Sequence, residues 1–416
     1  MTILAQRPVA RPPIATSSGA LRAGIAGGIA FGLLGWRGLL VPSLVRSIEP
    51  AFGRSDAELG SYFLATAISY AAGSLIGARL IRSLGERRVL SAAALLIALG
   101  LAVQSVTTSW LVFAAAGVGA SLGAAASDMG LNALVLDLFP HARGRALNLL
   151  HVMYSAAALA APLALAFGVE AGMSWQTAFT GTAVAAVAIA VLLFVFVPAD
   201  PAAVGGVAAA ESVARRRSPV SGAHPEAALP AAPGARRLPP FLLLLALALA
   251  LYVGAESGTS DWLVRYLAAL PLAVAGTALT MFWGGIAFGR VVFARIGNRF
   301  EPLATAGVLA YSGSCLVALA VLVPVSGATP LLFGVAGIAF GPVFPLVVAG
   351  AGARMPGRSS TVSATMTFAG VLGAIVYPPA MGVMSVTIGL PVAMLGTAVL
   401  LAGAGTAVLL GRRLRP

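Results

Sequence analysis

The stretch "FLLLLALALALYVGAESGTSDW" (residues 241–262) determines the class of fold, because its first fifteen residues contain no charge. About 20 consecutive apolar residues are enough for one helix to cross the hydrocarbon core of a bilayer. Runs of this kind recur along the chain without the alternation that barrel strands require. Since only helices and closed barrels satisfy the backbone in lipid, the pattern predicts membrane-spanning helices.

Composition supports the same class, because 59% of the 416 residues are hydrophobic and only 9% are charged. The predicted fold is an all-α integral membrane protein with twelve transmembrane helices in two six-helix, pseudo-symmetric bundles. The expected spans are 20–45, 57–81, 88–106, 110–138, 144–168, 175–198, 240–267, 271–294, 301–325, 329–351, 359–383 and 388–411.

The segment 199–239 is the longest interruption between spans, and it is rich in Ala, Pro and Gly with several arginines. Such a composition cannot build a core, so we expect a flexible cytoplasmic linker. It would join an N-terminal bundle at 20–198 to a C-terminal bundle at 240–411. Cytoplasmic tails are expected at 1–19 and 412–416, and we expect the protein to be a monomer.

The net charge of +13 comes entirely from arginine, since the chain has no lysine. With both termini in the cytoplasm, 21 of the 26 basic residues fall in inside segments. This asymmetry follows the positive-inside rule, so it predicts a multi-pass protein of the cell membrane rather than a nucleic-acid partner.

The two halves carry similar basic, glycine-containing connections, "IGARLIRSLGERRVL" (76–90) and "FGRVVFARIGNRF" (288–300), after equivalent spans. Two related halves with a binding site at their interface are the usual plan of a secondary transporter. The chain therefore resembles the major facilitator superfamily over essentially its whole length.

Shorter motifs are similar to those of the fucose and glucose/galactose permease family within that superfamily. They are "LYVGAE" (251–256), "FWGGIAFGR" (282–290), "SDMGLN" (127–132) and "RALNLLHVMYS" (145–155). The resemblance implies transport of a sugar or related polyhydroxy compound.

The chain departs from these patterns at several positions. Arg82 stands where the superfamily's loop signature has an Asp that latches neighbouring helices, so that latch is altered or absent. Gly38, four residues before Pro42, replaces the permease family's first-span Asp. His151 and Tyr154 stand at its fifth-span Gln and Asn positions. A fucose-like mechanism through the first-span Asp therefore cannot be carried over.

Ionisable residues inside spans are costly and are functional candidates by default. Arg37 and Glu256 lie at similar depths in equivalent spans, roughly 25 Å from the inner end at ~1.5 Å per residue. We expect them to face each other or to share a ligand, as a substrate-sensitive pair or as an ion pair that fixes packing. Tyr252, one turn earlier, is expected to point the same way, and Trp262 to stack on substrate or lie in the interfacial aromatic belt. Asp261 is expected to be solvated.

A second cluster is expected near the inner side, where Asp128 and Asn132 are four residues apart on one helix face. His151, Asn148 and Tyr154 lie on the next span. Asp128 and His151, with Glu256 as a third candidate, could load and unload a proton. Asn132, Asn148 and Tyr154 could bind substrate hydroxyls, while the alternative for the cluster is hydrogen-bonded helix packing.

Arg290 lies near the inner end of its span, where it is expected to be structural or part of a cytoplasmic gate. The stretches "FGPVFP" (340–345) and "YPPAMG" (377–382) predict kinks in the tenth and eleventh spans.

No nucleotide-binding loop, metal-ligand spacing or nucleophile motif stands out, so we expect no cofactor, no metal and no enzymatic activity. The function expected is secondary active transport of a small polar solute, most simply a sugar, by alternating access coupled to H⁺. Two alternatives stay open: an H⁺-antiport exporter of a drug or anionic metabolite, and a non-transporting membrane sensor of the same fold.

Overall fold

The computed structural model describes residues 18–199, 238–355 and 358–414. The tail expected at 1–19 and the linker expected at 199–239 lie outside the described residues, except at their ends. The first half contains α1 (Ser18–Gly38), α2 (Leu40–Phe52), α3 (Asp56–Leu84), α4 (Glu86–Val106), α5 (Trp110–Leu138), α6 (Arg143–Glu170) and α7 (Trp175–Phe196). The second contains α10 (Pro240–Tyr266), α11 (Leu272–Ile296), the short η1 (Gly297–Arg299), α12 (Pro302–Leu322), α13 (Thr329–Phe340), α14 (Val343–Arg354), α15 (Ser359–Ile388) and α16 (Leu390–Arg413).

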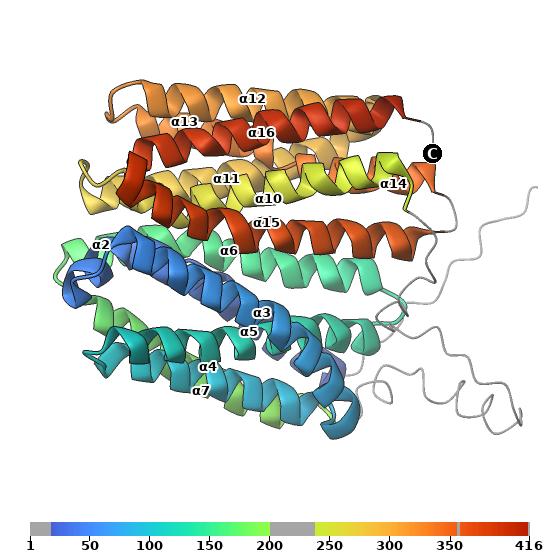
Figure 1. The fold of residues 1–416 in the computed structure, drawn as a ribbon. Coiled ribbons are helices and arrows are strands. Elements are labelled where there is room, and N and C mark those ends of the chain that lie inside the picture. Colours follow the sequence, from blue (N-terminus) through green and yellow to red (C-terminus); the bar gives the residue numbers. More distant parts are fainter. Residues whose placement is uncertain (1–17, 200–237, 356–357, 415–416) are drawn as a thin grey trace, which may run out of the picture.

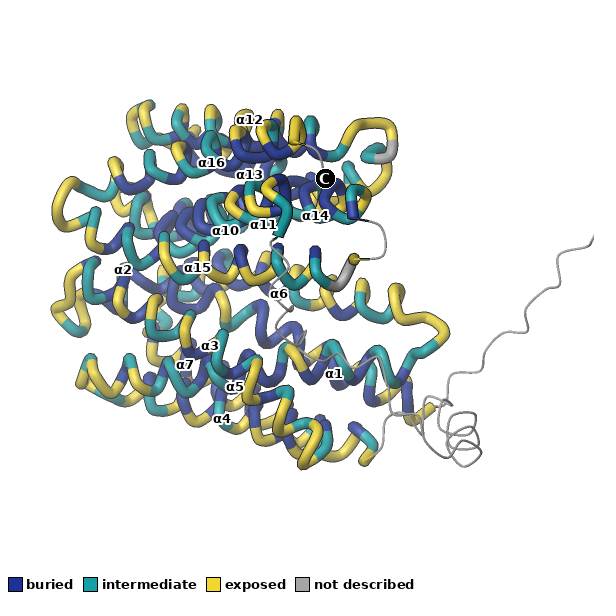
Figure 2. The backbone as a smooth tube through the Cα atoms, turned by 45° about the vertical axis from the view of Figure 1, so that its right-hand side comes forward, coloured by how far each residue is buried: buried dark blue, intermediate teal, exposed yellow. Residues whose placement is uncertain are grey.

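These elements form twelve spans that are long and apolar enough to cross a membrane, which confirms the predicted number. The two halves lie one above the other in Figure 1, with the blue-to-green first half below the yellow-to-red second half. We call the end of the molecule where α1 and α10 begin and α16 finishes the terminal end, and the opposite end the far end. Many large apolar side chains on the helix surfaces are exposed, which suits contact with hydrocarbon rather than water (Figure 2).

Two spans differ from straight rods. The first continues beyond the predicted limit of 45 as α2, after a break at Leu39. The tenth is divided into α13 and α14 by Gly341 and Pro342, as the predicted kink requires. In contrast, α15 runs through Pro378 and Pro379 as one helix.

Small residues let neighbouring helices approach closely. A Cβ built on Gly123 of α5 would lie 2.6 Å from the carbonyl oxygen of Ala93 on α4, so only glycine fits there. At Gly285 and Gly289 of α11 a Cβ would collide with the backbone of α13. Such close contacts replace the hydrophobic driving force that is missing between helices in lipid.

The halves meet through α3 against α15, α6 against α11, and α2 against α10. Gly60 near the start of α3 lies against Pro379 and Gly382, and Gly276 near the start of α11 lies against Pro162 and Ala166. Both glycines lie in the far half of their helices, so the halves are packed together toward the far end.

Candidate functional site

Asp128 is the centre of a hydrogen-bonded group in the first half. Its Oδ2 accepts a bond of 2.5 Å from the hydroxyl of Tyr70 on α3, and its Oδ1 accepts one of 2.8 Å from Nδ2 of Asn132. The spacing of four residues on α5 thus places Asp128 and Asn132 together, as predicted. Tyr70 was not identified from the sequence, because its distance from Asp128 along the chain hides the contact.

His151 and Asn148 do not join this group, so the predicted Asp–His–Asn cluster is wrong for this structure. Both are exposed on α6, and within the described residues neither side chain makes a hydrogen bond or ion pair. The His151 ring instead packs edge-on against Phe31 of α1, with 5.1 Å between the centroids. The reason is that α6 packs mainly against α1 and, across the halves, α11, although α5 precedes it in the chain.

Arg37, on the last turn of α1, turns toward α5. Its Nη2 donates a 2.7 Å bond to Oγ of Ser121, and its Nε is buried with no acceptor in the described part of the chain. Tyr154 lies alongside: its hydroxyl is 3.5 Å from where a Cβ on Gly38 would be, and its ring is 5.7 Å from that of Phe31.

Glu256 pairs with Arg290 and not with Arg37, so the expected Arg37–Glu256 ion pair is absent from this structure. Oε1 of Glu256 is 3.5 Å from Nη2 of Arg290, whose Nε donates to the carbonyl of Gly341 at 3.2 Å. Arg290 therefore extends inward along α11 instead of snorkelling to the terminal end. The depth of a residue along its helix does not show toward which helix its side chain points. It therefore could not predict that Arg37 points toward α5 or that Arg290 extends to Glu256.

Tyr252 and Trp262 are fully buried, which corrects the expectation that Trp262 stacks on substrate or lies in the interfacial belt. Tyr252 points the same way as Glu256, as expected, and the two side chains interact. The Tyr252 hydroxyl donates to the carbonyl of Phe340 at 3.0 Å, beside the break in the tenth span. Nε1 of Trp262 donates to the carbonyl of Pro378 at 2.9 Å, and its ring packs against Phe63 from the other half. Asp261, expected to be solvated, is half-buried instead.

Tyr154 connects the two groups electrostatically. Its phenol is close enough to the charges of Arg37 and Asp128 in its own half, and of Glu256 and Asp261 in the other, to interact with each of them. Polar side chains from both halves thus converge on one central region.

Arg82 does not act as a latch within the described residues. It is exposed in the last turn of α3 and has no hydrogen bond or ion pair there. The tight connection to α4 depends instead on Gly85, whose positive φ of 80° is accessible to glycine at little cost.

An ionic latch between the halves, which the sequence did not predict, closes the far end. Nε of Arg265 on α10 is 2.7 Å from Oε2 of Glu49 and 3.0 Å from Oδ1 of Asp56, both in the first half. Ser385 of α15 also donates to Oδ2 of Asp56. The two carboxylates are almost fully buried, so the latch is shielded from water and ions.

Backbone contacts reinforce this latch. Arg46 donates to the carbonyls of Leu270 and Ala268 at 2.9 and 3.1 Å, and the backbone N–H of Ala273 donates to Glu170 at 2.7 Å. Neither Arg46 nor Arg265 was a candidate site residue in the sequence analysis. Oppositely charged residues lie at the ends of the equivalent spans 1 and 7. This was the one feature of the sequence that could have indicated the latch.

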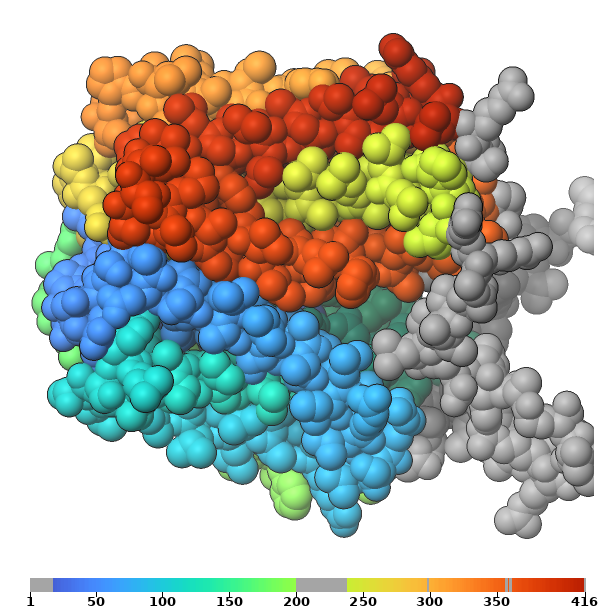
Figure 3. Space-filling model, viewed as in Figure 1, coloured from blue at the N-terminus to red at the C-terminus, as the bar shows by residue number. Residues whose placement is uncertain are grey.

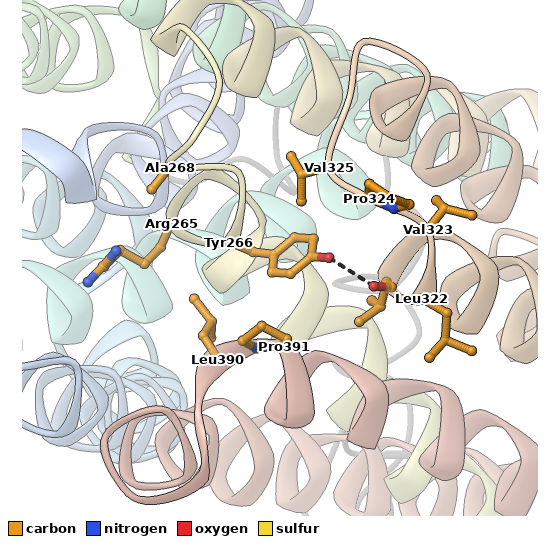
Figure 4. A pocket seen from close by; sticks show the side chains of 10 residues that line it. Arg265, Tyr266, Ala268, Leu322, Val323, Pro324, Val325, Leu390 and Pro391 are labelled. Atoms are coloured by element: carbon orange, nitrogen blue, oxygen red, sulfur yellow. Dashed lines mark hydrogen bonds between the residues drawn. The ribbon is translucent and has the colours of Figure 1, made fainter.

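Two depressions lie on the far-end surface and not at the central group. One of about 340 Å³ is lined by latch residues including Arg46, Glu49 and Arg265. The other, of about 450 Å³, is lined by Arg265, Tyr266 and mostly apolar residues between α12 and α16 (Figure 4). Because the Tyr266 hydroxyl there donates only to the carbonyl of Val321, at 3.5 Å, we assign no chemistry to this second depression.

The bonds between the two halves are concentrated at the far end of the molecule. In the described part of the chain, the hydrogen bonds and ion pairs between halves all lie in the far half of the molecule. Figure 3 shows a hollow between α3 and α15 that widens toward the terminal end and has α6 at its back. The described residues thus join the halves at the far end and leave a hollow between them toward the terminal end.

Comparison with known proteins gives the same architecture. A bacterial homologue of the human lysosomal transporter Spinster, in an inward-facing and occupied conformation, superposes with a TM-score of 0.74 at 16% identity, covering 94% of this chain and 96% of that one. A D-xylose–proton symporter gives 0.69 at 14% identity (96% and 98% covered). The E. coli fucose:proton symporter gives 0.54 at 17% identity (95% and 98% covered).

At these identities the likeness establishes the fold alone. No curated protein matches the chain in sequence. The family model described as Major Facilitator Superfamily matches residues 23–378, which is most of the chain. The chain therefore belongs to the major facilitator superfamily.

Proposed function

We propose that this protein is a secondary active transporter that moves a small polar solute by alternating access, with H⁺ as the coupling ion. The observation that carries the proposal is the central region, where polar groups of both halves converge. It is open toward the terminal end and closed toward the far end by the Arg265 latch. Alternating access requires a central site that is reached from one side of the membrane at a time.

The direction of this state follows from the charge asymmetry. If both termini lie in the cytoplasm, as the arginine distribution favours, the structure corresponds to an inward-open state of a multi-pass cell-membrane protein. Movement to the outward-open state would break the latch and bring the terminal ends of the two halves together.

Substrate would contact both halves. Asn132, Asn148 and Tyr154 offer donors and acceptors for hydroxyl groups from the first half. Glu256, held by Arg290, would contribute from the second. A sugar or sugar-like compound suits such a set, and the fucose and xylose neighbours are described as proton symporters of sugars.

Asp128 is the residue we propose for the proton. As a carboxylate it accepts bonds from Tyr70 and Asn132. Protonation at Oδ1 would remove the acceptor of one Asn132 N–H and release that N–H for substrate, while the bond from Asn132 to the backbone carbonyl of Asp128 remains, so proton and solute would bind together. We keep His151, which is exposed on α6, as the second candidate for carrying the proton.

The test is flux measured with the purified full-length protein in proteoliposomes. A panel of labelled sugars, sugar acids and nucleosides is offered with and without an imposed pH gradient. We expect at least one compound to accumulate against its gradient only when the pH gradient is present. Saturable binding without flux for every compound that binds would contradict the proposal and support a sensor.

A further inference from the structure

The Arg37 guanidinium has no counter-charge among the described residues. Its only hydrogen bond in the described residues is to the neutral Ser121, and no described carboxylate oxygen lies within 4.0 Å of its nitrogen atoms. Arginine stays charged in proteins, so it cannot relieve this cost by losing its proton. An unpaired charge at membrane depth is expensive and marks a binding position.

None of the three acids of the central region pairs with Arg37, and Asp261 lies more than 4.0 Å from every nitrogen of its guanidinium. Both oxygens of Asp128 are bonded, one to Tyr70 and one to Asn132. Glu256 is paired with Arg290 in the other half. In this open state, therefore, Arg37 is free to receive a negative charge from outside the chain.

A ligand can reach the Arg37 side chain, and a neighbouring residue can supply a second hydrogen-bond donor. The Arg37 side chain is only partly buried, and its Nη1 makes no hydrogen bond within the described residues, whereas its unbonded Nε is buried. The Tyr154 hydroxyl, which lies against the adjacent Gly38, makes no hydrogen bond within the described residues and can serve as a second donor.

From this arrangement we propose that the transported solute carries a carboxylate that binds the Arg37 guanidinium and the Tyr154 hydroxyl. A planar carboxylate matches the paired N–H groups of a guanidinium. One free cation balances one negative charge, so a monocarboxylate fits better than a doubly charged phosphate. The hydroxyl-bearing part of the solute would then face Asn132 and Asn148. The substrate class is thus a small hydroxylated monocarboxylate such as a sugar acid, and this inference rests on the proposed transport function.

The experiment compares matched pairs that differ in one group. Proteoliposomes are offered gluconate and sorbitol, glucuronate and glucose, and galacturonate and galactose, with glucose 6-phosphate as the phosphate arm. We expect exchange of at least one acid to exceed that of its neutral partner and of the phosphate by tenfold or more. Arg37→Gln should abolish that exchange, whereas Arg37→Lys should retain it with an apparent affinity reduced about 10- to 100-fold.

Two variants control for folding and general charge. Ser121→Ala keeps the guanidinium but removes its hydrogen bond, so it should keep the preference for acids with a weaker apparent affinity. Arg88→Gln, at an exposed position of α4, should behave as wild type.

The experiment distinguishes failure of the carboxylate inference from failure of the transport proposal. Exchange of neutral sugars without the acids, preference for the phosphate, or acid exchange unaffected by Arg37→Gln would overturn the carboxylate inference and leave transport standing. Saturable binding without flux for every compound that binds would overturn both proposals.

Discussion

At the scale of single residues, the two halves differ in how their charged side chains are paired. The first half holds a carboxylate, Asp128, with two neutral donors and leaves Arg37 without an acid. The second half pairs Glu256 with Arg290 beside the carbonyls of the broken tenth span. The pair therefore serves to hold the second half of the site in place, while the first half keeps groups that can exchange ligands.

The Glu256–Arg290 pair can be measured by a double-mutant cycle. Glu256→Gln and Arg290→Gln should each lower the thermal stability of the detergent-solubilised protein by about 1 kcal/mol, because each leaves one charge unpaired at membrane depth. The double variant should lose clearly less than the sum. Arg295→Gln, at the exposed end of α11, is the control. Strict additivity would show that the two side chains do not interact.

At the scale of elements, glycine contacts between α11 and α13 set how closely these helices pack. A Cβ on Gly289 would collide with the carbonyl of Ile338. Gly289→Ala should therefore lower thermal stability by about 1–3 kcal/mol through overpacking. Gly352→Ala on α14, where a Cβ would meet nothing within 4 Å, should leave stability unchanged or raise it slightly. Equal effects of the two substitutions would refute this packing role.

The far-end latch joins α10 to α2 and α3, and its removal should favour the state that opens at the far end. In a Cys315→Ser background, Phe63→Cys places a thiol between the halves beside Trp262. Adding Arg265→Gln should raise its labelling by a membrane-impermeant maleimide several-fold, because the ion pairs that join α10 to Glu49 and Asp56 are then lost.

The control for the latch is Arg54→Gln. Arg54 lies at the same end but pairs only with Glu58 of its own half, at 2.7 Å. This substitution should leave the labelling rate unchanged. If Arg265→Gln gave no more labelling than Arg54→Gln, the latch would not control opening.

At the scale of the whole molecule, the spans and the break at Gly341–Pro342 were predictable because both depend on local chemistry. Hydropathy shows which segments are apolar over enough residues to cross a bilayer. A Gly-Pro pair interrupts a helix wherever it occurs. Likewise, the Asp128–Asn132 contact follows from the spacing of four residues within one helix.

The remaining features depend on how helices rotate and which ones become neighbours. Depth matched Arg37 to Glu256, but depth carries no information on which side of a helix a residue faces. His151 was assigned to Asp128 because α5 and α6 are consecutive, whereas α6 packs on α1 and α11. The latch joins residues more than 200 positions apart, and no local sequence pattern brings such residues together.

The central claim, that a proton bound at Asp128 drives solute movement between the two halves, is tested most directly with Asp128→Asn in proteoliposomes. For the compound that wild type accumulates, both gradient-driven uptake and counterflow at equal pH are measured in the same preparation. We predict that the variant loses gradient-driven uptake and keeps counterflow, since it binds and moves solute without a proton site. Counterflow also verifies that the variant is folded and inserted. Accumulation at the wild-type level in Asp128→Asn would contradict the account.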